Sequence, residues 1–171
     1  VNPIRAYTTI AVAHAGTPYI TAYRWSVPGA GFGTKFADPA TLPAGIGNGV
    51  AFSPSGDVIA VAQGSSPYVS AYPWSISGFG AKFANPSTLP TGSGNGVAFS
   101  PSGNAIAVAH NTSPYVSAYP WSGAGFGTKF ANPAVLPGNL AAGVAFSPSG
   151  DAIALSASNS PYVYVYPWSI S

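Results

Sequence analysis

The chain has 171 residues, of which 47% are hydrophobic and 13% aromatic, so it is long enough and apolar enough for one folded domain. Five Lys and Arg residues against three Asp give a net charge of +2 with no basic stripe, which argues against nucleic acid as a partner. No run approaches the roughly 18 apolar residues of a membrane-spanning helix, so no membrane insertion is expected.

Turn-forming residues are unusually frequent, with 21 Gly and 18 Pro. Ten Tyr, nine Phe and four Trp supply more buriable surface than a disordered segment carries, so the Gly and Pro indicate turns between many short strands. The chain begins at Val1 instead of Met, which suggests processing or a longer parent polypeptide. Low charge density favours an extracellular or virion-surface setting.

Three sequence blocks recur with a period of about 47 residues. The block GVAFSPS occurs at 49–55, 96–102 and 143–149. The block SPYVSAYPWS, or a close variant, occurs at 17–26, 66–75, 113–122 and 160–169. A GFG-x-KFA block occurs at 31–37, 78–84 and 125–131, with no fourth copy. The predicted units of this single repeat domain are 1–49, 50–96, 97–143 and 144–171, the last one partial.

Within one unit the residues predict four strands. Val50–Ser53 and Val58–Gln63 form a hairpin around the turn Ser53-Pro-Ser-Gly, which has Pro at its second position and Gly at its fourth. Tyr68–Trp74 follows as the third strand, where alternate residues share one face. A shorter fourth strand is predicted at Ala81–Ala84. No segment carries the apolar period of a helix.

The first two strands are apolar on both faces, so neighbouring sheets must cover each other. A radial array of small sheets meets this need, and we predict an all-β fold, a β-propeller with about 3.6 to 4 four-stranded antiparallel blades and roughly fifteen strands. Because proline cannot donate to a ladder, a bulge or strand end is expected at Pro73 and at its equivalents Pro120 and Pro167.

The segment GVAFSPSGDVIAVAQGSSPYVSAYPWS at 49–75 resembles a WD40 repeat, through its VAFSPSG hairpin and the Trp that closes the third strand. It departs from that family in having Trp-Ser in place of Trp-Asp, and in lacking the Gly-His pair. The resemblance implies a WD40-like propeller, similar also to low-charge repeat arrays of phage and environmental genomes.

Candidate catalytic and metal-binding residues are few. His14 and His110 share one repeat position and are interpreted as polar strand-end residues, since zinc needs three or four converging ligands. The carboxylates Asp38, Asp57 and Asp151 are interpreted as turn residues. We therefore expect no enzyme activity, no catalytic site, no metal and no cofactor.

Two kinds of repeated side chain have competing interpretations. The aromatic columns could be inter-blade packing or sugar-stacking platforms, and the repeated lysines could be edge-strand cations that discourage aggregation or a ring facing an acidic partner. The aromatic columns comprise Trp25, Trp74, Trp121, Trp168, Tyr19, Tyr68, Tyr115 and Tyr162. The lysines are Lys35, Lys82 and Lys129.

Three functions fit these observations: a non-catalytic structural protein that self-associates, a carbohydrate-binding propeller, and a fragment of a larger interaction scaffold. The first is favoured. Four blades are fewer than such propellers usually need, and an apolar face at each end predicts self-association into a closed ring or an open stack. The expected partner is therefore the chain itself, with a glycan or another protein as alternatives.

Overall fold

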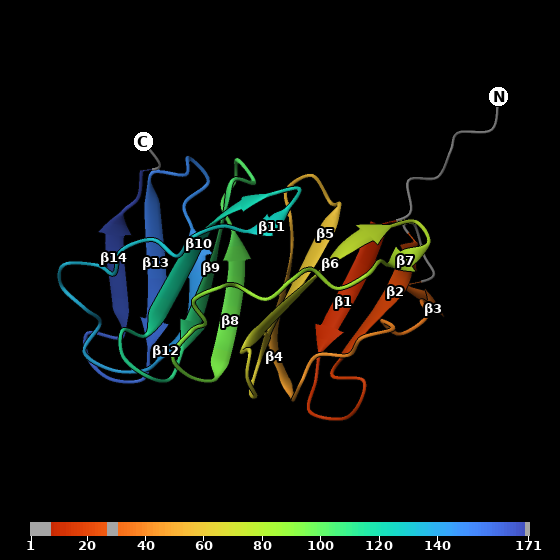
Figure 1. The fold of residues 1–171 in the computed structure, drawn as a ribbon, viewed down its shortest axis with the longest axis horizontal. Coiled ribbons are helices and arrows are strands. Elements are labelled where there is room, and N and C mark those ends of the chain that lie inside the picture. The colour runs from red at the N-terminus through yellow and green to blue at the C-terminus, as the bar shows by residue number, and fades with distance from the viewer. Residues whose placement is uncertain (1–7, 27–30, 170–171) are drawn as a thin grey trace.

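The computed structural model describes residues 8–26 and 31–169, which form fourteen strands in four antiparallel sheets (Figure 1). Blade 1 contains β1 (Thr8–Ala13), β2 (Ile20–Ser26) and β3 (Gly31–Lys35). Blade 2 contains β4 (Gly47–Phe52), β5 (Val58–Gln63), β6 (Val69–Ser75) and β7 (Gly78–Phe79). Blade 3 contains β8 (Gly94–Phe99), β9 (Ala105–His110), β10 (Val116–Ser122) and β11 (Gly125–Phe126). Blade 4 contains β12 (Ala141–Phe146), β13 (Ala152–Ala157) and β14 (Val163–Pro167).

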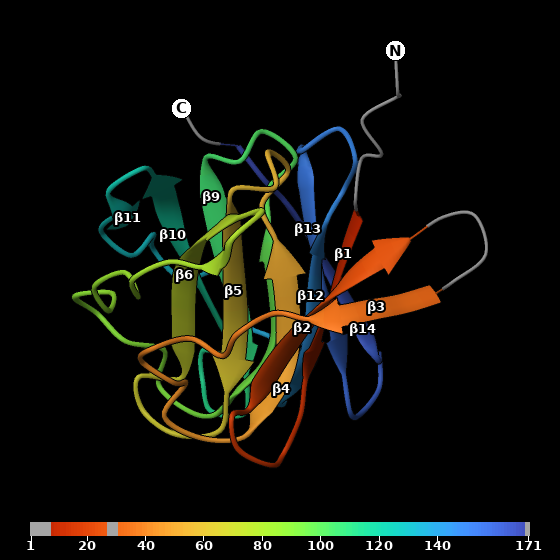
Figure 2. The ribbon, with the colours of Figure 1, turned by 90° about the vertical axis from the view of Figure 1, so that its right-hand side faces the viewer.

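Each blade is a meander whose strands pair in sequence order, so the predicted all-β propeller fold is confirmed. The inner strands β4, β8 and β12 begin at Gly47, Gly94 and Ala141, three residues before the predicted unit boundaries. Figure 2 shows that the first and last blades extend to one side of the inner strands and the two middle blades to the other, so the four blades form an arc. The described residues include no helix that could cross a membrane.

The inner hairpin of blades 2, 3 and 4 is closed by a serine side chain. In blade 2 the Ser53 hydroxyl accepts a hydrogen bond from the Val58 amide at 3.0 Å, and the Gly56 amide donates to the Ser53 carbonyl at 2.9 Å. Gly56 has a φ of 73°, in the left-handed region where glycine meets no steric penalty. The same contacts recur around Ser100 and Ser147, which explains the repeated Ser-Pro-Ser-Gly.

The fourth strand differs from the prediction. In blade 2 it is Gly78–Phe79, paired with Trp74 and Ser75, and Ala81–Ala84 lies outside any strand. A tight turn, with Gly78 at a φ of 101°, brings the chain back as soon as the third strand ends. Lys82, and Lys129 in blade 3, are therefore not edge-strand cations, whereas Lys35 does end the outer strand β3.

The expected interruption is wrong at Pro73 and Pro120, because β6 and β10 run through them, with Pro73 opposite Val58, whereas β14 does end at Pro167. The Pro73 carbonyl accepts from the Gly80 amide at 2.8 Å, on the outer edge of the strand where β7 has ended. At this position a backbone N–H would point toward the outer edge, where no neighbouring strand could accept its hydrogen bond. Proline therefore costs the sheet no hydrogen bond here.

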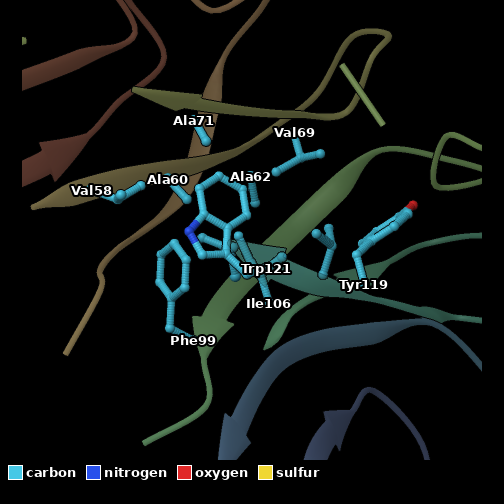
Figure 3. Packing of buried hydrophobic residues seen from close by; sticks show 11 residues of the cluster. Val58, Ala60, Ala62, Val69, Ala71, Phe99, Ile106, Tyr119 and Trp121 are labelled. Atoms are coloured by element: carbon cyan, nitrogen blue, oxygen red, sulfur yellow. The ribbon is translucent and has the colours of Figure 1, made fainter. Parts of the chain in front are cut away.

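The core lies between blades. All six residues of β5 and all six of β9 are buried. Figure 3 shows Ala60, Ala62 and Val69 of blade 2 facing Ile106 and the Trp121 ring of blade 3. Blade-to-blade contact is therefore where most apolar surface leaves water.

The inner strands approach one another closely. A Cβ placed on Gly96 of β8 would lie 3.0 Å from the Cα of Gly143 in β12, closer than nearly all real Cβ contacts. Glycine at this position permits the small strand separation near the axis.

Candidate functional site

The candidate site lies at the loop that connects blade 3 to blade 4, because this loop differs from the loops that connect the earlier blades. In the first two connections, a third-strand tyrosine donates a hydrogen bond to the connecting loop: the Tyr72 hydroxyl to the Thr41 carbonyl at 2.9 Å, and the Tyr119 hydroxyl to the Thr88 carbonyl at 2.8 Å. Burial raises the pKa of Tyr72 and of Tyr119 to about 12. Both hydroxyls are therefore protonated, and each has a hydrogen-bond partner in the connecting loop.

The third connection has a different sequence. Residues 131–144 read ANPAVLPGNLAAGV where 84–97 read ANPSTLPTGSGNGV, so Val135 replaces Thr88 and Ala141 replaces Gly94. A Cβ on Gly94 would clash with the Tyr68 carbonyl of the previous blade, so an alanine at this position requires a shift of the backbone.

The hydrogen bonds of the loop show this altered path. At the first two connections a loop carbonyl accepts from the amide after the second strand, as Ser93 does from Asn111 at 3.2 Å. At the third connection the corresponding amide, that of Ser158, donates instead to the Asn139 side chain at 3.2 Å.

A cavity of about 490 Å³ lies at this altered connection, between β10 of blade 3 and β13 and β14 of blade 4. Its wall is mostly apolar and includes Ala118, Val135, Ile153 and Leu155. Tyr166 is one of the lining residues, and its hydroxyl, the counterpart of the Tyr119 hydroxyl, is inaccessible to solvent and has no hydrogen-bond partner. The wall of the cavity therefore includes a residue whose hydroxyl the protein itself leaves without a hydrogen-bond partner.

The short outer strand of blades 2 and 3 has no counterpart among the described residues of blade 4. In blade 3, Phe126 of the outer strand packs edge-on against Tyr119 and Trp121, with ring centroids 5.6 and 4.9 Å apart. Trp168 of blade 4 keeps the ring contacts with Phe130 and Phe146 that Trp121 has with Phe83 and Phe99, but no described residue supplies the contact that Phe126 makes in blade 3.

Lys129 also lines the cavity. Its ammonium donates to the Asn132 side chain at 2.5 Å and to the Phe130 carbonyl at 3.4 Å, and burial lowers its pKa. Burial also raises the pKa of Tyr166, which keeps that phenol protonated. The residues that line the cavity thus include a neutral phenol and a cation, while the rest of the wall is mostly apolar.

The histidines lie elsewhere and do not converge. The His110 Nε2 lies 3.1 Å from the Ser117 hydroxyl, its Nδ1 is buried without a partner, and burial lowers its pKa. At the same position in blade 2, Gln63 accepts from the Ser70 hydroxyl at 2.8 Å. His14 occupies this position in blade 1.

Two of the three carboxylates, Asp57 and Asp151, lie in hairpin turns, and Asp38 lies in the irregular segment after β3. Asp57 and Asp151 accept hydrogen bonds from serine hydroxyls of their own turns, which lower the pKa of both, and Asp38 pairs with Lys35 at 2.5 Å. The described residues contain no group of three His, Cys, Asp or Glu that could hold a metal ion.

The predicted aromatic columns lie in and around the blade interfaces. Trp74 packs edge-on against Phe36, Phe52 and Phe79. The Tyr column closes the turn between the second and third strands, in the left-handed region. The φ angles are 71° at Tyr19, 68° at Tyr68 and Tyr115, and 65° at Tyr162.

Sequence reasoning missed the cavity and Tyr166. The available signal was the third connecting loop, which departs from its two nearly identical counterparts at positions such as Val135 and Ala141.

The fold and blade arrangement define a β-propeller. No family model and no curated protein matches the chain. Among solved structures it is similar to a 6-phosphogluconolactonase candidate from Bacteroides uniformis, with a TM-score of 0.66 and 14% identity over 86% of this chain and 43% of that one. It is also similar to a gluconolactonase from Xanthomonas campestris, with a TM-score of 0.62 and 18% identity over 91% of this chain and 45% of that one.

A third similar structure is the hydrazine synthase of Kuenenia stuttgartiensis, with a TM-score of 0.55 and 16% identity over 71% of this chain and 32% of that one. The chain spans less than half the length of each of the three proteins.

These similarities correct three predictions. The WD40 resemblance holds only at the level of the β-propeller, because two of these three similar structures are of the gluconolactonase type. The predicted non-catalytic structural role and the predicted absence of enzyme activity are wrong, because two of these propellers are described as lactonases. At 14 to 18% identity the likeness itself establishes the shared fold.

Proposed function

We propose that this chain forms part of a β-propeller that hydrolyses a lactone, and that the cavity between blades 3 and 4 holds the lactone ring. The observation that carries the proposal is the buried Tyr166 hydroxyl, which has no partner although its counterparts Tyr72 and Tyr119 both have one. Leaving such a group unpaired costs roughly 1–3 kcal/mol, which a ligand carbonyl in this cavity would offset.

The chemistry follows from the two polar groups of the wall. In lactone hydrolysis, water adds to the carbonyl carbon, the acyl–oxygen bond breaks, and the ring oxygen takes a proton to become a hydroxyl. The carbonyl oxygen gains negative charge as water adds, and the Tyr166 hydroxyl would stabilise it as a hydrogen-bond donor. The Lys129 ammonium at the same wall would favour the anionic intermediate and the carboxylate product.

The wall also argues for a substrate class. A polyhydroxylated ring would leave most of its hydroxyls unpaired against Ala118, Val135, Ile153 and Leu155, at a cost for each one. A lactone with an alkyl substituent places one acceptor near Tyr166 and apolar surface on the remaining wall. We therefore expect alkyl δ-lactones to be preferred over glucono-δ-lactone.

The test is acid release in a pH-stat from an alkyl δ-lactone and from glucono-δ-lactone, measured above the spontaneous rate. Wild-type protein should accelerate hydrolysis, and Tyr166→Phe should lower kcat by roughly a hundredfold, as expected for removal of one oxyanion donor. Tyr119→Phe is the matched control, because that hydroxyl donates to Thr88 outside the cavity and its loss should leave kcat unchanged.

Absence of acceleration with either lactone, or equal rates for wild type and Tyr166→Phe, would refute the proposal. Circular dichroism of each variant verifies the fold.

A further inference from the structure

We propose that two copies of this chain join head to tail, the open face of blade 4 in each copy packing on the open face of blade 1 in the other, to close an eight-bladed ring. The inference concerns the partner of the end blades and does not depend on the proposed lactonase activity.

Blade 4 exposes residues that are buried in the other blades. Val163 and Val165 of β14 are 56% and 63% exposed, whereas their counterparts in blade 2, Val69 and Ala71, are 0% and 1% exposed. A hollow of about 350 Å³ adjoins Val163 and is formed by β12 and β13. This face is therefore apolar, indented and uncovered.

The open face of blade 1 corresponds to the face with which blade 2 packs on the blade before it. Val12 of β1 is 39% exposed, whereas its blade 2 counterpart Val61 is fully buried. In the β1–β2 register Ile10 lies opposite Tyr23, as Ile59 lies opposite Tyr72 in blade 2. Blade 1 thus carries the same side chains with which blade 2 packs on its predecessor.

The interface between blades 1 and 2 is the template. There Ile20 and Ala22 of blade 1 pack in one cluster with Ile59, Val61 and Tyr72 of blade 2. The repeat positions of Ile20 and Ala22 are occupied in blade 4 by Val163 and Val165, and those of Ile59, Val61 and Tyr72 are occupied in blade 1 by Ile10, Val12 and Tyr23. Blade 4 of one copy and blade 1 of a second copy can therefore reproduce an interface that the chain already forms.

Two further observations favour closure with two copies. The four blades form an arc, with the first and last blades on the same side of the inner strands (Figure 2). The chain matches 43% and 45% of the two lactonase-type propellers, so two copies supply a comparable length. A two-fold axis would bury both open faces in two identical interfaces.

The experiment is light scattering of the purified chain over a range of micromolar concentrations. A mass twice the 17.1 kDa of one chain supports the ring. A mass of one chain at every concentration overturns the proposal, and masses that keep growing with concentration indicate an open stack and overturn the closed ring.

Charge substitutions test the head-to-tail geometry. Val165→Asp on the blade 4 face and Val12→Asp on the blade 1 face should each give monomers, whereas Ile76→Asp should remain dimeric, because Ile76 is 85% exposed in a turn outside both faces. An equimolar mixture of the two face variants has one intact pair of faces and should regain a weaker dimer.

A dimer formed by Val12→Asp alone would instead show a blade 4 to blade 4 contact and overturn the proposal. Circular dichroism checks the fold of each variant. Tyr166→Phe should keep the dimer mass, so loss of lactone hydrolysis with an unchanged mass would count against the proposed function only.

Discussion

Tyr72, Tyr119 and Tyr166 occupy the same place in blades 2, 3 and 4, and their hydroxyls differ in hydrogen bonding. The Tyr119 hydroxyl donates to the Thr88 carbonyl at 2.8 Å, whereas the Tyr166 hydroxyl is buried without a partner. Tyr119→Phe should therefore lower the free energy of unfolding by about 1 kcal/mol, because it removes a hydrogen bond. Tyr166→Phe should leave that free energy unchanged or raise it.

Urea unfolding of the two variants measures this difference. The same loss in both would show that the Tyr166 hydroxyl has a partner in solution. Because the two substitutions remove the same atom from equivalent positions, the comparison isolates the hydrogen bond.

A buried histidine should make stability depend on pH. Burial lowers the pKa of His110 in the folded protein, so between the lowered value and the ordinary value near 6.5 the unfolded chain binds more protons. The contribution of His110 is fully present above pH 6.5 and is lost as the pH falls through the lowered value. His110→Gln should reduce this acid loss of stability, because glutamine does not titrate.

Blade 2 supplies the precedent for this variant. Gln63 occupies the same position and accepts from the Ser70 hydroxyl, as a glutamine at 110 could from Ser117. The reciprocal variant Gln63→His should add a pH-dependent loss over the same range. Denaturant midpoints measured from pH 5 to 8 test both, and parallel curves for wild type and His110→Gln would contradict the prediction.

At the scale of the strand, the separation of the inner strands depends on glycine. The alanine methyl in Gly96→Ala would lie 3.0 Å from the Gly143 Cα and 3.4 Å from the Val144 amide nitrogen, both of them backbone atoms. Neither can move without shifting β12, so we expect a loss of about 1–3 kcal/mol in the free energy of unfolding. Gly123→Ala is the control, because nothing lies within 4 Å of that Cβ. An equal change in both variants, measured by urea unfolding, would exclude the close approach as the cause.

Local elements were predictable from sequence and contacts across blades were not. The hairpin of Val50–Ser53 and Val58–Gln63 could be predicted from its turn residues and apolar strands, because both signals lie within a few positions of the sequence. The strand at Gly78–Phe79 was missed because pairing there depends on a tight turn and on the Trp74 partner. The cavity was missed because Tyr166 and Val135 meet only after two blades have packed together.

At the scale of the whole molecule, each blade is covered only by its neighbours, so stability should vary along the arc. The strands β5 and β9 are buried throughout, whereas Val163 and Val165 of β14 are more than half exposed. In the Val165→Asp variant, amide exchange should therefore be slowest in β5 and β9 and fastest in β14 and β1, because the open end blades can unfold without disrupting the middle interfaces.

The ring should remove this gradient in the wild-type chain. When blade 4 packs on blade 1 of a second copy, opening of β14 requires dissociation, so its amide protection should rise with protein concentration while that of β5 stays constant. Hydrogen exchange followed by mass spectrometry at several concentrations measures both strands in one experiment. Protection of β14 that does not change with concentration, or that is already equal to that of β5 in Val165→Asp, would mean that the end faces are covered without a second copy.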